Sequence, residues 1–199
     1  MNHSLLDDIR HATRTLHRDV EARLGEGHSS WTAAPYVRLL QITHAIVLPL
    51  EPVLDARLGD VFSAPPPATR SRRLEADLRA MGAVIRAVPC ELTVESDAEA
   101  FGVGYVLQGS LLGGAVVSRQ VRQVMGAGAA TGYFGMYGTG LGAAWARYCA
   151  SLNAFGEAAS AVDRAAAVSA AVAAFSAFDV AIGRLSCYPD DPTRLPGGT

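Results

Sequence analysis

The sequence predicts an all-α protein built as a single helical domain. Apolar residues recur at three- and four-residue spacing along several long segments, whereas strand-like alternation is rare. Two serine-to-acid spacings, Ser4 with Asp7 and Ser96 with Glu99, resemble the capping boxes that begin helices. The chain has 199 residues, of which 50% are hydrophobic and 18% charged. This composition supplies one hydrophobic core and excludes intrinsic disorder for most of the chain.

The first half of the chain contains three predicted helical segments. The first, over residues 5–24, has an apolar stripe formed by Leu5, Ile9, Ala12, Leu16 and Val20. The second covers residues 36–58, and Pro49 and Pro52 are expected to interrupt it. The third follows a proline connector at 65–67, and its stripe consists of Leu74, Leu78, Met81 and Ile85. Five arginines around it are expected to form a solvated face: Arg70, Arg72, Arg73, Arg79 and Arg86.

The second half is also predicted to be helical. A long helix is expected over residues 98–125, with Gly126 and Gly128 after its end. A glycine-rich turn over 132–142 leads to a helix around 145–153, and a last long helix is expected over 158–185. The helical domain thus spans residues 1–188, and the proline- and glycine-rich segment 189–199 is expected to be a flexible tail.

Charge and cysteine content narrow the possible partners and location. All 17 basic residues are arginine, and with 19 acidic residues the net charge is −2, which argues against nucleic-acid binding. Three cysteines without a CxxC pair favour a reducing cytoplasm, and the N-terminus lacks the basic start of a signal peptide. Residues 165–182 are long and apolar but mostly alanine, so we expect a packed soluble helix and no membrane association.

One face of the first helix could hold a ligand. Thr13, His17 and Glu21 are spaced four residues apart and therefore lie along the same face. An imidazole there can ligate a metal through one nitrogen while the other donates to the carboxylate. Arg10 and Arg14 lie on preceding turns, where they can meet the carboxylates of an anionic ligand. The alternative is an ordinary histidine with a helical salt-bridge partner.

The helix over 98–125 carries an unusual number of glycines. Each costs about 0.5–1 kcal/mol relative to alanine, so their presence indicates that something approaches the backbone closely. Either another helix crosses there or a flat ligand lies there. A histidine helix and a glycine-rich helix would together form the walls of a slot for a planar macrocycle, with His17 as proximal ligand. The glycines are Gly102, Gly104, Gly109, Gly113 and Gly114.

The histidine-bearing helix and the glycine-rich helix both resemble segments of one protein family, and they follow each other in the order found in that family. Residues 9–21, IRHATRTLHRDVE, are similar to the proximal helix of haem oxygenases. Residues 101–114, FGVGYVLQGSLLGG, resemble the distal helix, particularly that of the bacterial, biliverdin-producing branch. Residues 39–51 end in Pro-Leu-Glu, as such bacterial sequences often do. The resemblance covers about residues 5–185 and implies a helical bundle with haem between a proximal and a distal helix.

The resemblance also implies roles for single residues. His17 matches the axial histidine and Glu21 its supporting carboxylate, while Arg10 sits where a basic residue approaches a haem propionate. Thr13 and Tyr105 join the predicted cofactor-binding set. Further pocket contacts are expected from Trp145, Arg147, Tyr148, Phe175 and Phe178. The predicted catalytic positions over the distal haem face are Gly109, Ser110, Gly113 and Gly114.

The sequence departs from the pattern of some haem oxygenases at one position that concerns proton delivery. Well-known mammalian-type members carry an aspartate after the first distal glycine, where this chain has Ser110. Serine can hold a water molecule but bears no charge. The bacterial branch has serine there too, so we interpret it as a branch feature.

The activity implied is oxidative opening of haem to biliverdin, carbon monoxide and ferrous iron. Haem, with its iron, would be both substrate and cofactor, and dioxygen the co-substrate. Electrons would come from a ferredoxin or a reductase, and a bilin-binding photoreceptor is one candidate acceptor of the product.

Three alternatives stay open at this point. A non-catalytic haem carrier or sensor would use the same slot. A di-iron enzyme would need Glu-x-x-His pairs, and none of the five histidines has a glutamate three residues before it. A haem-free protein of this fold, either a hydrolase or an interaction module, would need a reactive cysteine such as Cys90 or Cys149, which we interpret as small core residues. We do not expect the other four histidines to be ligands: His3, His11, His28 and His44.

Overall fold

The computed structural model describes residues 3–25 and 31–186 and contains six α-helices in this part of the chain. The predicted tail over 189–199 and His28 lie outside the described residues. Two 3-10 turns, η1 (Gly59–Val61) and η2 (Gly138–Gly140), join the helices, and the described residues form no strand. The all-α prediction is confirmed. The helices are α1 (Leu5–Leu24), α2 (Ala33–Leu58), α3 (Arg70–Ala80), α4 (Asp97–Met125), α5 (Leu141–Ala158) and α6 (Ala161–Ser186).

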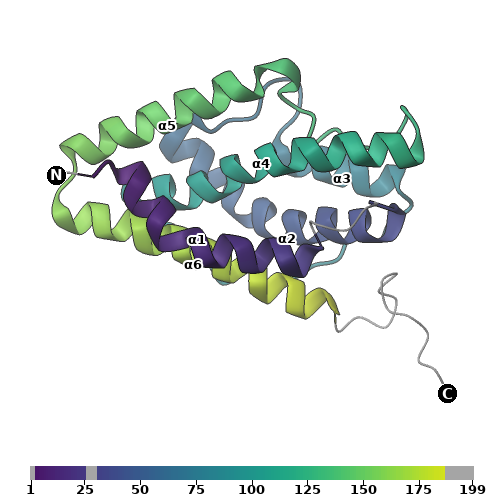
Figure 1. Ribbon diagram of the computed structural model, residues 1–199, viewed down its shortest axis with the longest axis horizontal. Coiled ribbons are helices and arrows are strands. Elements are labelled where there is room, and N and C mark those ends of the chain that lie inside the picture. The colour runs from purple at the N-terminus through teal and green to yellow at the C-terminus, as the bar shows by residue number, and fades with distance from the viewer. Residues whose placement is uncertain (1–2, 26–30, 187–199) are drawn as a thin grey trace.

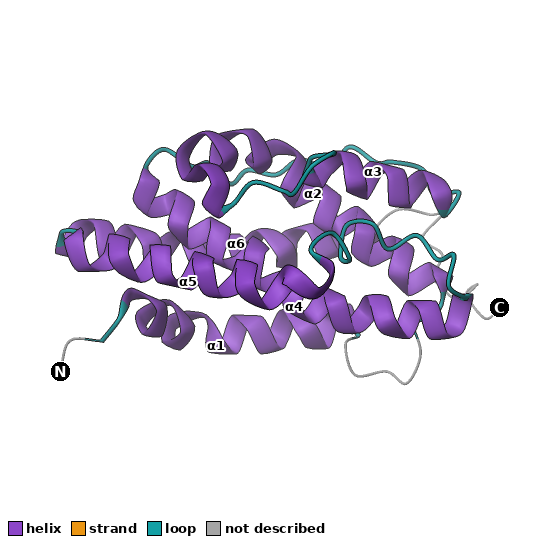
Figure 2. Cartoon of the chain, turned by 90° about the horizontal axis from the view of Figure 1, so that it is seen from above, coloured by secondary structure: helices purple, strands orange, loops and turns teal. Residues whose placement is uncertain are grey.

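Helix α4 is the centre of the bundle. Figure 1 shows it between α5 on one side and the pair α1 and α6 on the other, and α6 contacts α4, α1 and α2. The capping box that begins α4 is confirmed, because Ser96 Oγ accepts from the Glu99 amide at 3.2 Å and Glu99 Oε2 accepts from the Ser96 amide at 3.3 Å. Figure 2, viewed from above, shows that long loops connect the helices near α3.

Helix α1 begins and ends where the sequence predicts. Ser4 Oγ accepts from the Asp7 amide at 3.2 Å, and Gly25 ends the helix in the left-handed region. The predicted stripe is correct except at Ala12, which is exposed, while Thr13 is buried. The start of α1 is fixed to α5 because the Leu6 amide donates to Asn153 Oδ1 at 3.1 Å.

The predicted interruption of α2 is wrong. The helix runs continuously through Pro49 and Pro52. A proline inside a helix costs about 3 kcal/mol, but Ile46, Leu50 and Leu54 are buried on either side of these residues. Packing of this face keeps the helix in one piece.

The third apolar stripe extends beyond its helix. Leu74 and Leu78 are buried in α3, but the helix ends at Ala80 because Gly82 has a φ of 67°. Met81 and Ile85 therefore pack against the core from a loop.

The boundary between the last two helices also differs from prediction. Ala158 belongs to α5, Ala159 is extended, and Ser160 Oγ accepts from the Asp163 amide at 3.1 Å to begin α6. Helix α5 itself starts at Leu141, earlier than expected.

The prediction of a solvated arginine face is wrong for Arg70. This side chain is fully buried at the start of α3, with its guanidinium 4.1 Å from the centre of the Phe62 ring. It donates to the Phe62 carbonyl, to Gln108 Oε1 at 2.6 Å and to the Tyr137 hydroxyl at 3.2 Å. Arg72 and Arg79 are exposed as expected.

By length and composition only, three segments of the described residues could span a membrane: Ala33–Val61, Asp97–Met125 and Ala161–Ser186. Residues 165–182 lie within α6, where Ala167, Ala171 and Ala174 are fully buried in the bundle. The small side chains of this stretch thus serve helix packing.

Candidate functional site

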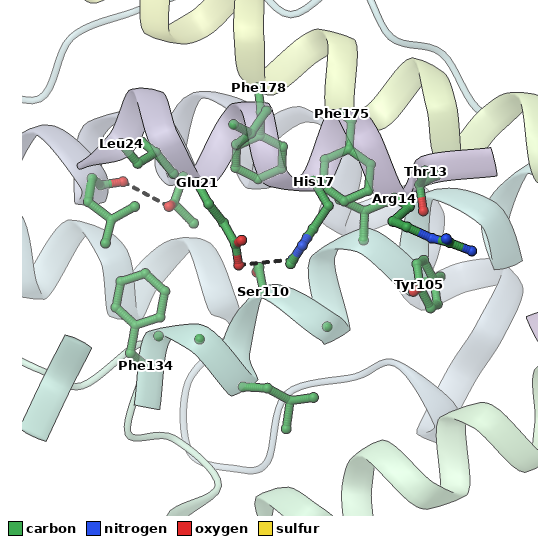
Figure 3. Close-up of a pocket in the computed structure, with 18 of the residues that line it drawn as sticks. Thr13, Arg14, His17, Glu21, Leu24, Tyr105, Ser110, Phe134, Phe175 and Phe178 are labelled. Carbon is green, nitrogen blue, oxygen red and sulfur yellow. Dashed lines mark hydrogen bonds and ion pairs between the residues drawn. The ribbon is translucent and has the colours of Figure 1, made fainter. Parts of the chain in front are cut away.

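A cavity of about 500 Å³ lies between α1 and α4, and this volume is within the range of small-molecule sites. Helices α2, α5 and α6 and the loop after α4 also contribute to its walls, and Figure 3 shows Phe175 and Phe178 of α6 and Phe134 of the loop beside it. The cavity brings together twelve of the fourteen residues to which the resemblance gives a role. It is lined by Arg10, Thr13, Arg14, His17, Val20, Glu21, Leu24, Leu39, Thr43, Tyr105, Val106, Gly109, Ser110, Leu112, Gly113, Gly114, Phe134, Trp145, Phe175 and Phe178.

His17 and Glu21 form one wall of the cavity. His17 Nε2 lies 3.4 Å from Glu21 Oε1, and the histidine side chain is 58% exposed. The imidazole and the Phe175 ring form a T-shaped contact, with ring centres 5.6 Å apart and planes at 89°. The carboxylate approaches one ring nitrogen only, which leaves Nδ1 without this contact. The imidazole is therefore oriented and accessible, as a ligating histidine must be.

The glycines of α4 divide into two groups. A Cβ at Gly102 would lie 2.0 Å from the Ala167 carbonyl oxygen on α6, and one at Gly104 would lie 2.5 Å from the Tyr148 hydroxyl on α5. These two glycines serve helix packing. Gly109, Gly113 and Gly114 line the cavity, and a Cβ at Gly113 would have no neighbour within 4 Å. Close packing against another helix thus accounts for Gly102 and Gly104, whereas Gly109, Gly113 and Gly114 face the cavity.

Ser110 lies on the cavity wall between these glycines. Its hydroxyl donates to the Leu107 carbonyl at 2.8 Å, a bond within its own helix. The hydroxyl oxygen has lone pairs left to accept a hydrogen bond from a ligand or a water molecule in the cavity. Ser110 can thus offer an acceptor at this wall but no charge.

Arg10, Arg14 and Tyr105 make one end of the cavity polar. Burial raises the pKa of the Tyr105 phenol, whereas Arg10 and Thr13 beside its hydroxyl lower it. Thr13 itself donates to the Ile9 carbonyl at 2.8 Å. Two guanidinium groups and a protonated phenol make this end suitable for carboxylates.

Two predicted pocket residues lie elsewhere. Arg147 is exposed on α5 and does not line the cavity. Tyr148 is buried, and its hydroxyl donates to the Phe101 carbonyl at 2.7 Å, which holds α5 to α4. Trp145 and Phe178 do line the cavity.

Sequence reasoning missed several lining residues, most notably Phe134. It lies in the glycine-rich segment between α4 and α5, where no periodicity marks a buried side chain. Thr43 and Leu39 on α2 were also missed, although they face the same way as the buried stripe of that helix.

The other histidines and the cysteines have different surroundings. His44 is buried on α2, and its Nε2 lies 3.8 Å from Glu75 Oε1. His3 and His11 line a second depression beside the start of α1, which shares Arg10 and Arg14 with the cavity. Cys149 is partly buried, and burial raises the pKa of its thiol, which disfavours the thiolate that a nucleophile requires.

A search of solved structures finds a similar fold. The chain resembles the haem oxygenase of Neisseria meningitidis, solved with bound NO and CO, with a TM-score of 0.74 and 19% sequence identity. The match covers 95% of this chain and 96% of that one.

The chain has the haem oxygenase fold. No protein-family model matches the sequence. No curated protein matches it either. Helices α1 and α4, which the sequence predicts as the two walls of a slot, both line the cavity.

Proposed function

We propose that the chain is a haem oxygenase that converts haem to biliverdin, carbon monoxide and ferrous iron. The observation that carries this proposal is the placement of His17, with Glu21 beside it, across a cavity of about 500 Å³ from the open space at Gly113. Haem would be both substrate and cofactor, with dioxygen as co-substrate. The fold shared with a haem oxygenase supports the same function.

The donor set of the cavity suits haem. His17 offers a single nitrogen ligand, and Glu21 fixes the ring that carries it. One protein ligand on one wall fits haem, because the macrocycle would supply the other nitrogen ligands of the iron. The apolar rings of Phe175, Phe178 and Phe134 supply the walls that such a flat group needs.

The residues that line the cavity have different roles in haem binding and turnover. Bound haem supplies the redox-active iron and the macrocycle that is opened. His17 holds the iron side, and Glu21 accepts from the second imidazole nitrogen to keep the ring in place. Arg10 and Arg14 pair with the propionates and fix the orientation of the ring plane. Gly113 leaves room above the opposite face, and Ser110 Oγ holds the water molecule that delivers protons there.

The partners follow from the chemistry. The reaction consumes electrons, which we propose come from a ferredoxin or a reductase. A bilin-binding photoreceptor is a candidate acceptor of biliverdin. We further propose that the protein works in the cytoplasm, because its cysteine content and net charge of −2 fit that compartment better than an extracellular or nucleic-acid-bound location.

An absorption time course tests the function. Purified protein is mixed with one equivalent of haem and then given reductant and oxygen. A Soret band that forms and decays into a biliverdin spectrum is the expected result. A Soret band that persists would instead indicate a haem carrier or sensor, and the absence of a band would overturn haem binding altogether.

A further inference from the structure

The cavity has two ends of opposite character. Arg14 and Leu24 both line it from α1, and at 1.5 Å per residue they are about 15 Å apart along the helix. Figure 3 shows Arg14 and Tyr105 at one end, and Leu24 with Phe134 at the other. A flat ligand with carboxylates on one edge would therefore place its apolar edge against Phe134.

Phe134 reaches the cavity from a loop, here called the Phe134 loop and defined as residues 129–137. Phe134 is buried, its ring centre is 4.9 Å from that of Tyr133, and its ring rests on Gly114. The loop contains no regular helix or strand, although backbone hydrogen bonds from the Gly135 amide to the Thr131 carbonyl at 2.9 Å and from the Met136 amide to the Tyr133 carbonyl at 3.3 Å form turns around Phe134. These turns shape the loop, and contacts with neighbouring helices fix where it lies.

Helix α3 supplies the main contacts. Asp77 is only 5% exposed, and its two carboxylate oxygens accept from the amides of Gly132 at 2.9 Å and Tyr133 at 2.8 Å. Arg70 precedes Asp77 by seven residues, or two helical turns, and therefore lies on the same face of α3. It donates to the Tyr137 hydroxyl at 3.2 Å. These two buried charged residues hold the loop on both sides of Phe134.

Two further helices complete the attachment. The Tyr36 hydroxyl on α2 donates to the Ala130 carbonyl at 2.7 Å. Arg122 on α4 donates to Thr131 Oγ1 from Nε at 3.0 Å and from Nη2 at 2.6 Å. All of these bonds involve loop residues around Phe134 and leave the phenyl ring as the part of the loop that faces the cavity.

We propose that Phe134 is a specificity-determining residue that contacts the apolar edge of the bound macrocycle and limits how far it enters the cavity. Asp77 is the positioning residue that holds Phe134 there. This inference rests on the proposed function. It assigns to Phe134 control over how deep and in which rotation the macrocycle sits. The rotation in turn decides which carbon bridge of the ring faces the glycines of α4.

The first test needs no haem. In Asp77→Asn one acceptor oxygen becomes an NH2 group that faces a backbone donor, so the loop loses a bond and gains a repulsion. Hydrogen exchange of the ligand-free protein should then become about tenfold faster at the Gly132 and Tyr133 amides. Glu75→Gln is the matched control, because it makes the same change on α3 at a carboxylate that accepts from Arg79 and not from the loop.

The second test uses haem, and its main variant, at Phe134, leaves the Asp77 carboxylate in place. Phe134→Ala should weaken haem binding about tenfold, because it removes the ring that contacts the apolar edge of the macrocycle. It should also give a mixture of biliverdin isomers where the wild type gives one predominant isomer. Asp77→Asn should shift the isomer ratio in the same direction, and Phe134→Leu should restore most of the affinity.

The outcomes separate the two proposals. Failure of the wild type to bind haem would overturn the proposed function and the role of Phe134 with it. If neither Phe134→Ala nor Asp77→Asn changes the affinity for haem or the isomer ratio, the role of Phe134 alone is overturned. Unchanged amide exchange in Asp77→Asn would overturn the positioning role of Asp77.

Discussion

The ring of Phe134 rests directly on Gly114, so that a Cβ atom added at this glycine would lie 1.9 Å from Phe134 Cδ1. At the preceding residue, Gly113, an added Cβ would meet nothing within 4 Å. Two adjacent glycines therefore have different functions. Gly114 allows a side chain to pack against the backbone, and Gly113 keeps part of the cavity open.

Alanine substitutions should distinguish these two functions in the ligand-free protein. Gly114→Ala should lower the free energy of unfolding by about 1–3 kcal/mol, because Phe134 must move. Gly113→Ala should raise it by about 0.5–1 kcal/mol, because alanine is the better helix former and meets no atom. Urea denaturation measures both. Equal effects of the two substitutions would contradict this assignment.

A larger side chain at Gly113 should block the cavity without unfolding the protein. In Gly113→Phe the ring would occupy the space assigned to haem, so we expect at least about a hundredfold weaker haem binding, equivalent to about 2.7 kcal/mol. The control is Gly142→Phe on α5, where an added Cβ also meets nothing within 4 Å but the residue does not line the cavity. Titration of the Soret band compares them, and equal affinities would refute the cavity as the haem site.

Removal of the imidazole tests the ligand assignment. His17→Ala should abolish the normal axial ligation and shift the Soret band of the haem complex, with the fold unchanged, because the side chain is largely exposed. His11→Ala is the matched control, since this histidine lies on the same helix but does not line the cavity. An unchanged spectrum in His17→Ala would make the assignment wrong.

Much of the fold can be predicted from residues that lie close together in the sequence, such as helix caps. Ser4 and Gly25 bound α1, and Ser96 with Glu99 begins α4, because capping depends on residues close in the sequence. The end of α3 is also local, but the apolar stripe through Met81 and Ile85 obscured the signal of Gly82. The cap at Ser160 was present in the sequence and was overlooked.

The parts that could not be predicted depend on contacts distant in sequence. The burial of Arg70 is decided by Phe62, Gln108 and Tyr137, which come from three other segments. The place of Phe134 depends on Asp77, 57 positions away. Helical periodicity predicts the walls formed by α1 and α4, since each is one face of one helix. It contains no information on a loop that other helices hold.

The buried guanidinium of Arg70 should matter far more than its exposed neighbour. Arg70→Ala leaves the Phe62 carbonyl and Gln108 Oε1 without a buried donor and removes the stacking on Phe62. We expect the free energy of unfolding to fall by about 2–4 kcal/mol. Arg72→Ala, on the same helix but exposed, should change it by less than about 0.5 kcal/mol. Chemical denaturation with similar losses in both variants would contradict the role given to Arg70.

The stability of the protein should depend on pH through His44. Burial lowers the pKa of this imidazole below its ordinary value of 6.5, and the nearby Glu75 offsets this only in part, while Arg79 lowers the pKa further. Between pH 6.5 and the lower pKa of the folded state, the unfolded chain binds more protons than the folded chain. The free energy of unfolding must therefore fall as the pH is lowered through this window, by at most about 1.4 kcal/mol per pH unit.

His44→Gln removes this titration and keeps a polar side chain at the same place on α2. The difference in free energy of unfolding between wild type and variant should be constant above pH 6.5 and should shrink as the pH falls below it. Urea denaturation at a series of pH values from 8 to 5 measures this difference. Two parallel curves over the whole range would mean that His44 carries a proton as easily in the folded protein as in the unfolded chain, and that its burial beside Glu75 has no effect on its ionisation.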